Sequence, residues 1–339
     1  MRAPEFWNIK DGRDSAPMIR FLLSPVAWIY GWMAARRIEK SDSYDPGIPV
    51  ICVGNATLGG TGKTPIAIYL LKSLSRMGLN TVGLTRGYGG TQKGPMIVKK
   101  DHTAQDVGDE ALLLSRHAPI WVSAGRDDGA RAAQAYGASL IIMDDGHQNP
   151  QVKKTLSLLV VDAEIGFGNG AVFPAGPLRE RLSRALGRAD AIILMKPTRE
   201  FEISDELSET LKGHIIIPAT FRSEQNLPKT KLFAFAGIGR PNKFFDSLRR
   251  AGADIVEEIP YADHYRYKPE DMQQLNELAA EYGADLITTE KDHVRIPKPY
   301  NASVHTWPVT VEFEDELTLR RLLHPIIEQA KAAQASHAK

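Results

Sequence analysis

The sequence predicts an α/β fold in which a mostly parallel sheet carries helices on both faces and a smaller α/β unit follows. Two observations predict this fold. Short runs rich in β-branched and aliphatic residues alternate with segments of helical spacing along the 339 residues. One such run, residues 48–54, leads into a Gly-rich turn and then a helix, the local order of a phosphate-binding loop.

The composition is that of an ordinary soluble globular protein, with 43% hydrophobic and 24% charged residues. The length favours two domains, which we expect at 1–225 and 226–339. A net charge of +1 gives no overall attraction to nucleic acid. The single cysteine, Cys52, falls in an apolar strand and is expected to be a buried hydrophobe. One cysteine allows no disulfide within the chain, which fits a reducing compartment.

The chain begins with an expected polar arm, residues 1–16, and an apolar helix at about 17–39. The uncharged window between Arg20 and Arg36 has 15 residues and contains Pro25, whereas a membrane-spanning helix needs about 20 apolar residues. A secretory signal is disfavoured, because a charged arm precedes the window and a nucleotide-binding strand follows it. Two interpretations stay open: a helix lying on a membrane surface, and a helix buried against the domain.

The phosphate-binding loop is expected between the strand at 48–54 and the helix that follows. Glycines let backbone N–H groups approach a polyphosphate, and a helix N-terminus favours negative charge. Lys63 would reach the β- and γ-phosphates, and the Thr64 hydroxyl would ligate Mg²⁺. Thr57 replaces the first glycine of the usual pattern, yet the remainder indicates a P-loop NTPase-like domain. The predicted nucleotide-binding residues are Gly59, Gly60, Thr61, Gly62, Lys63 and Thr64.

Two further segments place polar residues at the ends of elements. A strand at 80–85 leads into Arg86 and Tyr88, and ligands bind at the carboxyl ends of strands in open α/β sheets. Asp109 and Glu110 open the next helix. Acidic residues in the first turn of a helix are common, so Asp109 by itself favours a structural role.

A metal-binding strand is predicted at 139–145. Four apolar residues followed by Asp144 and Asp145 have the form of a Walker B strand, which delivers carboxylate to Mg²⁺ beside the phosphate loop. Adjacent carboxylates repel one another unless a cation lies there. We therefore expect Mg²⁺ to be held by Thr64 with Asp144 or Asp145.

The remaining segments extend this sheet and add the second unit. An Arg-rich stretch at 173–188 is by default a solvated face, with an anion contact as the alternative. Gly237–Asn242 imitates a dinucleotide fingerprint without its third glycine, so NAD is not expected there. Further strands are expected at 119–123, 156–162, 189–195, 214–217, 232–236, 254–256 and 285–289, with a linker at 223–231 and helices at 127–136, 243–251, 269–282 and 315–333.

Seven motifs occur in one order along the chain: Gly59–Pro65, Thr85–Tyr88, Gly108–Glu110, Asp144–Gln148, Pro174–Glu180, Asp263–Tyr265 and Thr289–Asp292. In order and spacing this set resembles the tetraacyldisaccharide 4′-kinases, the lipid A 4′-kinases of Gram-negative bacteria. The resemblance runs from about Pro25 to Val311. Two departures, His147 and Ala111, lie beside functional positions rather than on them.

The resemblance implies phosphorylation of the 4′-hydroxyl of an acylated disaccharide 1-phosphate, with ATP and Mg²⁺, giving a bisphosphorylated lipid A precursor. It implies peripheral attachment to the cytoplasmic face of the bacterial inner membrane. Because such a substrate stays in the bilayer, the resemblance favours the membrane-surface interpretation of the helix at 17–39. No nucleic acid and no obligate protein partner are expected.

The resemblance also implies roles for single residues. Asp109 would act as general base with support from His264, and Lys63 would assist catalysis. Asp109 and His264 fall in different predicted domains, so the smaller domain would close over the site and exclude water. The implied substrate contacts are Arg86, Tyr88, Glu110, Arg126, Gln148, Arg179 and Asp263.

Two other classes of protein remain as alternatives. A P-loop switch or partitioning ATPase acting on a protein partner would share the Gly-rich loop. Leu58 stands where partitioning ATPases usually carry a signature lysine, which disfavours that class. A soluble small-molecule kinase would leave the apolar N-terminal helix without a role.

Overall fold

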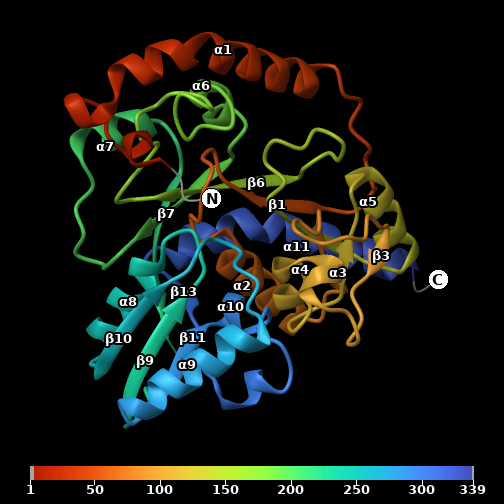
Figure 1. Cartoon of the computed structure of the whole chain (residues 1–339). Helices are drawn as coiled ribbons and strands as arrows, with labels where there is room; N and C mark the ends of the chain where they lie inside the picture. Colours follow the sequence, from red (N-terminus) through yellow and green to blue (C-terminus); the bar gives the residue numbers. More distant parts are fainter. Residues whose placement is uncertain (1–3, 224, 338–339) are drawn as a thin grey trace.

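The computed structural model describes residues 4–223 and 225–337. Residues 1–3 of the predicted arm, Glu224 of the predicted linker and residues 338–339 of the predicted second domain lie outside the described residues. The chain forms a nine-stranded sheet and a four-stranded sheet, and Figure 1 shows the smaller one below the larger. The predicted α/β class is confirmed.

The nine-stranded sheet has the order β13-β8-β7-β6-β1-β5-β2-β4-β3. Its strands are parallel except at the two edges, where β13 with β8 and β3 with β4 are antiparallel. The central strand β1 is completely buried, as its apolar sequence predicts. The strands are β1 (Val50–Gly54), β2 (Thr81–Thr85), β3 (Met96–Ile97), β4 (Ile120–Val122), β5 (Leu140–Asp144), β6 (Leu156–Asp162), β7 (Ala191–Lys196), β8 (Ile216–Arg222) and β13 (Thr310–Phe313).

Helices cover both faces of this sheet. Alternate residues of β1 point to opposite faces, so Ile51 and Val53 join one core cluster while Val50 and Cys52 join another. The first face carries α2 (Lys63–Arg76), α4 (Asp109–Leu114) and α11 (Glu316–His337). The opposite face carries α5 (Arg126–Ala135), α6 (Leu182–Leu186) and α7 (Asp205–Leu211).

The four-stranded sheet is parallel throughout and has the order β10-β9-β11-β12. Helix α9 packs on one face through Met272 and Leu275, and α8 packs on the other through Phe244 and Leu248. The elements are β9 (Lys231–Ala236), α8 (Pro241–Arg250), β10 (Ile255–Pro260), α9 (Pro269–Glu281), β11 (Ala284–Thr289), α10 (Glu290–His293) and β12 (His305–Trp307).

The C-terminal segment packs on the large sheet. After β12 the chain returns to the large sheet, where β13 pairs with β8. Helix α11 then packs Leu319, Leu323 and Ile326 into the large core. The apolar stripe of α11 packs in the same core as α2, on the large sheet. The strands of the smaller sheet therefore come from residues 231–307.

The N-terminal arm is docked rather than loose where it is described. It contains two short 3₁₀ helices, η1 (Glu5–Asn8) and η2 (Arg13–Ser15). The Trp7 side chain is buried, and its indole Nε1–H donates to the carbonyl of Pro174 at 3.1 Å. The Trp7 ring also meets Phe173 edge-on. A tryptophan with both an apolar and a polar partner anchors the arm.

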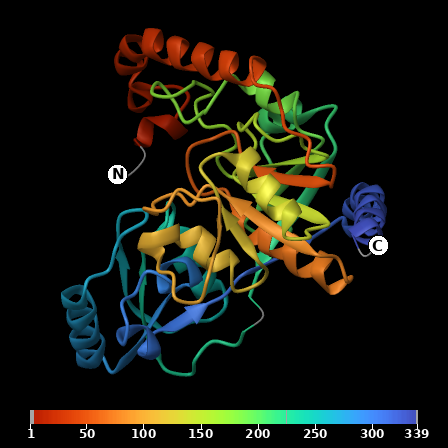
Figure 2. The ribbon, with the colours of Figure 1, turned by 90° about the vertical axis from the view of Figure 1, so that its right-hand side faces the viewer.

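Helix α1 (Pro17–Glu39) lies outside the body of the molecule and continues through Pro25. The buried residues in it are Ala27, Gly31 and Ala35, spaced four apart along one face. These small residues pack against the rest of the protein on one side of α1. The helix is therefore buried on one side and not on all sides. Figure 2 shows α1 at the end of the molecule opposite the smaller sheet.

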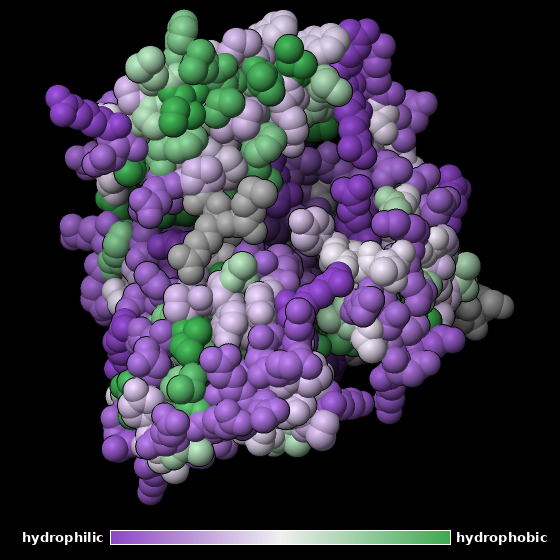
Figure 3. Space-filling view, viewed as in Figure 1, coloured by the Kyte–Doolittle hydropathy of each residue, from purple (hydrophilic) through white to green (hydrophobic). Residues whose placement is uncertain are grey.

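The outer face of α1 carries large apolar side chains. Phe21, Leu22 and Trp28 are 78%, 70% and 60% exposed, and Figure 3 shows a patch of hydrophobic residues where α1 lies. By length and composition alone, the helical stretch Arg13–Glu39 is apolar enough to cross a membrane, although core helices and signal sequences pass the same criterion. The helix thus combines a protein-facing stripe of small residues with an apolar outer face.

Candidate active site

A cleft of about 1000 Å³ lies between the two sheets and contains most of the predicted site residues. The large sheet contributes the phosphate loop and the loops after β2 and β5. The smaller sheet contributes the loops after β9 and β10, together with α10. The lining includes Lys63, Thr64, Arg86, Tyr88, Glu110, Arg126, Asp145, Gln148, Arg179, Asp263, His264 and Lys291.

The phosphate loop runs from the end of β1 to the start of α2 at Lys63, as predicted. Gly62 has φ 89°, a left-handed conformation that favours glycine, and it directly precedes the helix. A Cβ on Gly62 would also lie 2.6 Å from Cζ of Phe221, which packs over the loop. Both constraints require glycine here.

The acidic pair lies at the end of β5, directly beside the phosphate loop. Asp144 pairs in register with Val53 of β1, one residue before that strand ends. Asp145 has φ 53° and turns toward two cations, with Lys63 Nζ 3.6 Å and Arg179 Nη1 3.0 Å from its carboxylate. Burial raises the pKa of Asp145, but Lys63 and Arg179 outweigh burial and lower that pKa to about 2.

Asp144 has the opposite environment. It is 2% exposed, and neither of its carboxylate oxygens has a hydrogen-bond partner among the described residues. Burial, together with the nearby Glu110 and Asp145 carboxylates, raises the pKa of Asp144. A buried carboxylate without a partner is costly unless a proton or a cation joins it.

The residues present fit a magnesium ion that is shared with a nucleotide. The described chain holds no group of three or more His, Cys, Asp or Glu side chains suited to a metal. Mg²⁺ beside a phosphate loop needs only one or two protein ligands, because phosphates and waters supply the rest. Thr64 and the unpartnered Asp144 are the side chains that would hold the ion, and Asp145 is engaged by cations.

The structure brings Asp109 and His264 together across the cleft. His264 Nδ1 lies 2.9 Å from Asp109 Oδ2, although 155 residues separate them. Arg295 Nε lies 3.2 Å from the same carboxylate oxygen. Burial raises the pKa of Asp109, whereas His264, Lys291 and Arg295 lower it, with a net result of about 2. The Asp109 carboxylate is therefore ionised at neutral pH.

Three other predicted residues surround this pair. Glu110 forms an ion pair with Lys291 of α10 at 3.0 Å. Asp263 Oδ1 lies 3.8 Å from Nε2 of His264, and the Tyr88 ring lies 5.4 Å from the imidazole between centroids. These contacts gather charged groups of both sheets around one point of the cleft.

The side chains of Arg126 and Gln148 each donate a hydrogen bond to a backbone carbonyl. Arg126 is buried, its Nη1 donates to the Ser123 carbonyl at 2.8 Å, and its Nε has no partner among the described residues. Burial lowers the pKa of Arg126 to about 10, so the side chain remains a cation. Gln148 Nε2 donates to the Asn55 carbonyl at 2.9 Å.

Arg179 is engaged with the protein itself. Its guanidinium contacts Asp145, and its Nε donates to the Thr57 carbonyl at 3.1 Å. The residue precedes α6 instead of lying on a helix face. In this conformation, Arg179 links the acidic pair to the phosphate loop.

Sequence reasoning missed several residues of the site. Arg295 and Asp292 lie behind the Asp109–His264 pair, and Phe221 packs over the phosphate loop. The available signal was the Thr289–Asp292 motif for Asp292, whereas Arg295 follows the end of α10 at His293 and carries no motif. Phe221 carries no motif, because only the course of β8 brings it there.

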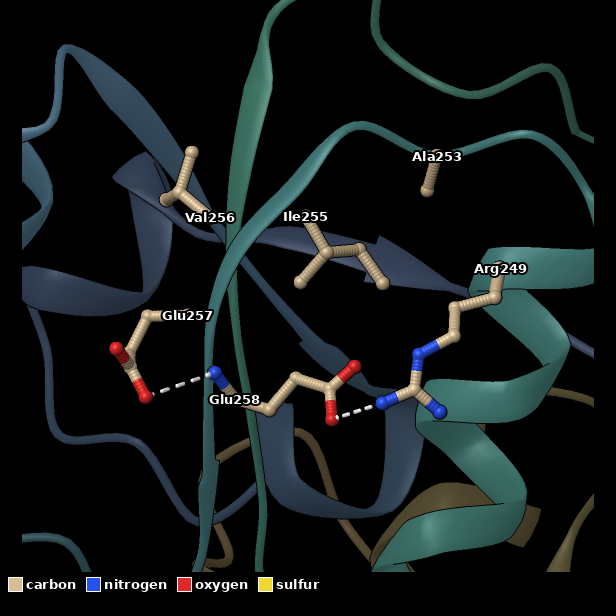
Figure 4. A pocket seen from close by; sticks show the side chains of 6 residues that line it. All are labelled: Arg249, Ala253, Ile255, Val256, Glu257 and Glu258. Atoms are coloured by element: carbon tan, nitrogen blue, oxygen red, sulfur yellow. Dashed lines mark hydrogen bonds and ion pairs between the residues drawn. The ribbon is translucent and has the colours of Figure 1, made fainter.

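A second hollow of about 570 Å³ lies beside α8 and β10. Figure 4 shows that its lining is a short stretch of β10 with Arg249, whose guanidinium reaches the carboxylate of Glu258. None of the predicted site residues lies in it. The cleft between the sheets therefore remains the candidate active site.

The chain is similar to known proteins over most of its length. Residues 19–328 match the sequence model of the family described as tetraacyldisaccharide-1-P 4′-kinase. Similar proteins named tetraacyldisaccharide 4′-kinase occur in Hyphomonas neptunium, 44% identical over 97% of this chain and 99% of that protein, and in Paramagnetospirillum magneticum, 45% identical over 93% and 95%. A crystal structure of LpxK from Aquifex aeolicus in complex with ATP is similar with a TM-score of 0.72 and 25% identity, covering 91% of this chain and 99% of that one.

Proposed function

The chain belongs to the tetraacyldisaccharide 4′-kinase family, and from this premise we propose how its residues carry out the reaction. The protein is an ATP-dependent kinase that phosphorylates the 4′-position of the acylated disaccharide 1-phosphate precursor of lipid A, and it uses ATP and Mg²⁺. The observation that carries the residue roles is the cleft in which the phosphate loop of one sheet faces His264 of the other.

The phosphate loop is proposed to hold the triphosphate of ATP. The loop amides and Lys63 would bind the β- and γ-phosphates, and Thr64 with Asp144 would hold Mg²⁺. Mg²⁺ supplies charge neutralisation on the transferred phosphoryl group. Support comes from the unpartnered Asp144 carboxylate beside the loop and from the position of Thr64 in the cleft.

Asp109 and His264 are proposed to act together in removing the proton of the 4′-hydroxyl. As that proton passes to the pair, the hydroxyl oxygen bonds to the γ-phosphorus, the bond between this phosphorus and the bridging oxygen breaks, and ADP leaves. The 2.9 Å contact between the two side chains supports this role. Each sheet supplies one member, so the pair depends on the smaller sheet lying over the cleft.

The disaccharide is proposed to lie where cations and polar groups of the large sheet meet the smaller sheet. Arg126 is the best-supported ligand for a substrate phosphate, because it is buried, positively charged and has an unpartnered Nε. Arg86, Tyr88, Gln148 and Asp263 line the same cleft. Glu110 and Arg179 also line it, each already paired with an opposite charge.

Helix α1 is proposed to rest on the cytoplasmic face of the bacterial inner membrane and to keep the enzyme near its lipid substrate. The exposed apolar side chains on its outer face support this, together with the basic residues Arg36 and Arg37 in its last turn. Arg37 also lines the cleft, so the membrane-facing helix and the site adjoin one another.

The proposal is tested by ADP release from Mg-ATP with and without detergent-dispersed tetraacyldisaccharide 1-phosphate. We expect turnover that depends on the lipid and is abolished in Lys63→Ala. Turnover that ignores the lipid would instead support the alternative, a switch-type ATPase acting on a protein partner. Full activity in Lys63→Ala would refute the role of the loop.

A further inference from the structure

We propose that Lys291 of α10 is a catalytic residue whose ammonium group binds the γ-phosphate of ATP on the side from which the sugar hydroxyl attacks. The inference rests on the proposed function and deepens it, because it adds a cation of the smaller sheet to the phosphate-binding groups of the large sheet. Lys291 belongs to the Thr289–Asp292 motif, which the proposed mechanism leaves without a role.

The turn between β11 and α10 places Lys291 in the cleft. Thr289 is the last residue of β11 and caps α10, since its Oγ1 accepts the backbone N–H of Asp292 at 3.0 Å. Asp292 is fully buried, and its carboxylate accepts the backbone N–H of Gly237 at 2.8 Å. Helix α10 also packs against α4, which lies on the large sheet (Figure 1). The turn that carries Lys291 is therefore fixed, and the side chain lines the cleft.

The Lys291 side chain keeps its charge and most of its hydrogen-bond donors. Its Nζ lies 3.0 Å from Oε1 of Glu110, and 22% of the side chain is exposed. Burial lowers the pKa of Lys291. The carboxylates of three neighbours, Glu110, Asp109 and Asp263, outweigh burial and raise that pKa. Among the described residues, Glu110 alone accepts a hydrogen bond from this ammonium group, so two of its three N–H donors remain for phosphate oxygens.

Without Lys291, this end of the cleft would repel a nucleotide. Asp109, Glu110 and Asp263 surround the ammonium group. The pKa of Asp144, already raised by burial, is raised further by the nearby Glu110 carboxylate. A triphosphate brings more negative charge to the same place, and like charges repel one another. A cation among these carboxylates therefore lets the γ-phosphate approach the acceptor hydroxyl.

The charges of two lysines, one from each sheet, reach the proposed Mg²⁺ ligand. Burial raises the pKa of Asp144, and so do the Glu110 and Asp145 carboxylates. Lys63 of the phosphate loop and Lys291 of α10 both lower it. Because Asp144 lies beside the loop that binds the triphosphate, both ammonium groups act on the same part of the cleft. Lys63 approaches the γ-phosphate from the loop, and Lys291 approaches it from the smaller sheet.

Lys291 stabilises the charge that develops during phosphoryl transfer. As the hydroxyl oxygen bonds to the γ-phosphorus and the bond to ADP breaks, negative charge lies on the equatorial oxygens of the phosphoryl group. The two available donors of Lys291 bind these oxygens in the transition state. The hydroxyl proton still passes to the Asp109–His264 pair, and Lys291 stays protonated throughout. A lysine that only tied α10 to α4 through Glu110 would stabilise the fold without this preference for the transition state.

The role of Lys291 is tested in Lys291→Met by steady-state kinetics and by the binding of a transition-state analogue. We expect kcat to fall by about 10²–10³-fold, the cost of removing a group that stabilises transition-state charge. The KM for ATP should stay within about threefold, because the phosphate loop still holds the nucleotide. In calorimetric titrations with the lipid present, ADP with Mg²⁺ should bind with wild-type affinity. The affinity for ADP with Mg²⁺ and aluminium fluoride should fall at least about tenfold.

Two further variants separate the charge of Lys291 from its place in the fold. Lys291→Arg keeps a cation and should recover part of the loss in kcat. Lys298→Met replaces an exposed lysine that follows α10 and is absent from the described cleft lining, so it should keep wild-type kcat. Urea unfolding of each variant shows whether the protein still folds as the wild type does.

The outcomes distinguish this inference from the proposed function. If Lys291→Met does not fold, Lys291→Gln decides, because its amide can still donate to Glu110. Wild-type kcat in the folded variant would overturn the inference, and so would a lower kcat with unchanged affinity for the aluminium fluoride complex. A wild-type protein that transfers no phosphate to the lipid would refute the proposed function itself.

Discussion

At the scale of single residues, the site separates two neighbouring aspartates by their surroundings. Asp145 is neutralised by Lys63 and Arg179, while Asp144 is buried with no partner among the described residues. The same pair of residue types in sequence therefore performs two tasks. Asp145 pairs with cations of the protein, and in the proposed mechanism Asp144 would hold the cation that arrives with the nucleotide.

Replacing Asp144 by Asn tests this division. We expect Asp144→Asn to lower kcat by about 10²–10³, because the transferred phosphoryl group loses its neutralising ion. The Mg²⁺ concentration that gives half-maximal activity should rise. Titrating activity with Mg²⁺ measures both effects, and Asp101→Asn, at an exposed position of the same sheet region, is the control. An unchanged Mg²⁺ titration would contradict the assignment.

Asp109 makes stability depend on pH. Its pKa in the folded protein is about 2, below the ordinary value of about 3.9, so it stabilises the fold above pH ~4 and loses that effect as the pH falls from ~4 to ~2. The contribution is about 2 kcal/mol. We expect the stability difference between wild type and Asp109→Asn, measured by urea unfolding, to shrink between pH 5 and pH 3. A constant difference would show that the charge of Asp109 contributes nothing.

The sequence identifies the residues with recognisable chemistry but not their partners. Lys63 and Asp144 follow from the phosphate-loop and Walker B patterns, whereas the role of His264 comes from the resemblance to the family. Arg295 could not be given a role from the sequence, since it reaches Asp109 only through the packing of one sheet on the other. Pairing of side chains across 186 residues is a property of the tertiary fold.

At the scale of elements, α1 uses its two faces differently. Ala27, Gly31 and Ala35 let the helix lie closely on the protein, and the large apolar side chains are left outside. Periodicity in the sequence does not show this division, because small and large apolar residues both score as hydrophobic.

Charges on the outer face of α1 should weaken membrane binding. The double variant Leu22→Glu with Trp28→Glu removes two exposed apolar side chains, so we expect binding to anionic vesicles to fall at least about tenfold. Co-sedimentation measures binding, and ATP binding should be unchanged. Met77→Glu with Leu317→Glu, exposed apolar positions elsewhere, is the matched control. If both double variants lose vesicle binding to the same extent, α1 has no special role in membrane binding.

Edge elements were the least predictable part of the fold. The buried strands β1, β5 and β6 stand out as continuous apolar runs. Strand β13 has four residues with an alternating pattern of burial and lies at a sheet edge. Its pairing with β8 therefore depends on the chain returning to the large sheet after β12. Helix α11 was expected, but the sheet on which it packs cannot be read from its own periodicity.

At the scale of the whole molecule, the two sheets are joined on either side of the cleft. Asp109 and His264 meet on one side. On another, Asp162 at the end of β6 lies 2.7 Å from Arg240 and 2.6 Å from Lys243, both at α8. These pairs hold the smaller sheet over the phosphate loop.

Removing Asp162 should loosen this arrangement. Asp162→Ala removes one of the two carboxylates that Arg240 and Lys243 share, and Glu164 still pairs with both cations. Because the cations are about a third exposed, we expect a loss of about 1–2 kcal/mol in the free energy of unfolding. Urea unfolding measures it. Asp246→Ala, which removes an exposed partner of Arg249, is the control. If Asp162→Ala and Asp246→Ala lower the free energy of unfolding equally, the ion pairs of Asp162 do not hold the two sheets together.

The most direct test of the central claim is the identity of the product. Wild-type protein would be incubated with Mg-ATP and tetraacyldisaccharide 1-phosphate, and the lipid examined by ³¹P NMR. We predict a second phosphomonoester on the 4′-oxygen, formed with one ADP per lipid and absent with Lys63→Ala. ADP formation that leaves the lipid with its single phosphate would contradict the account.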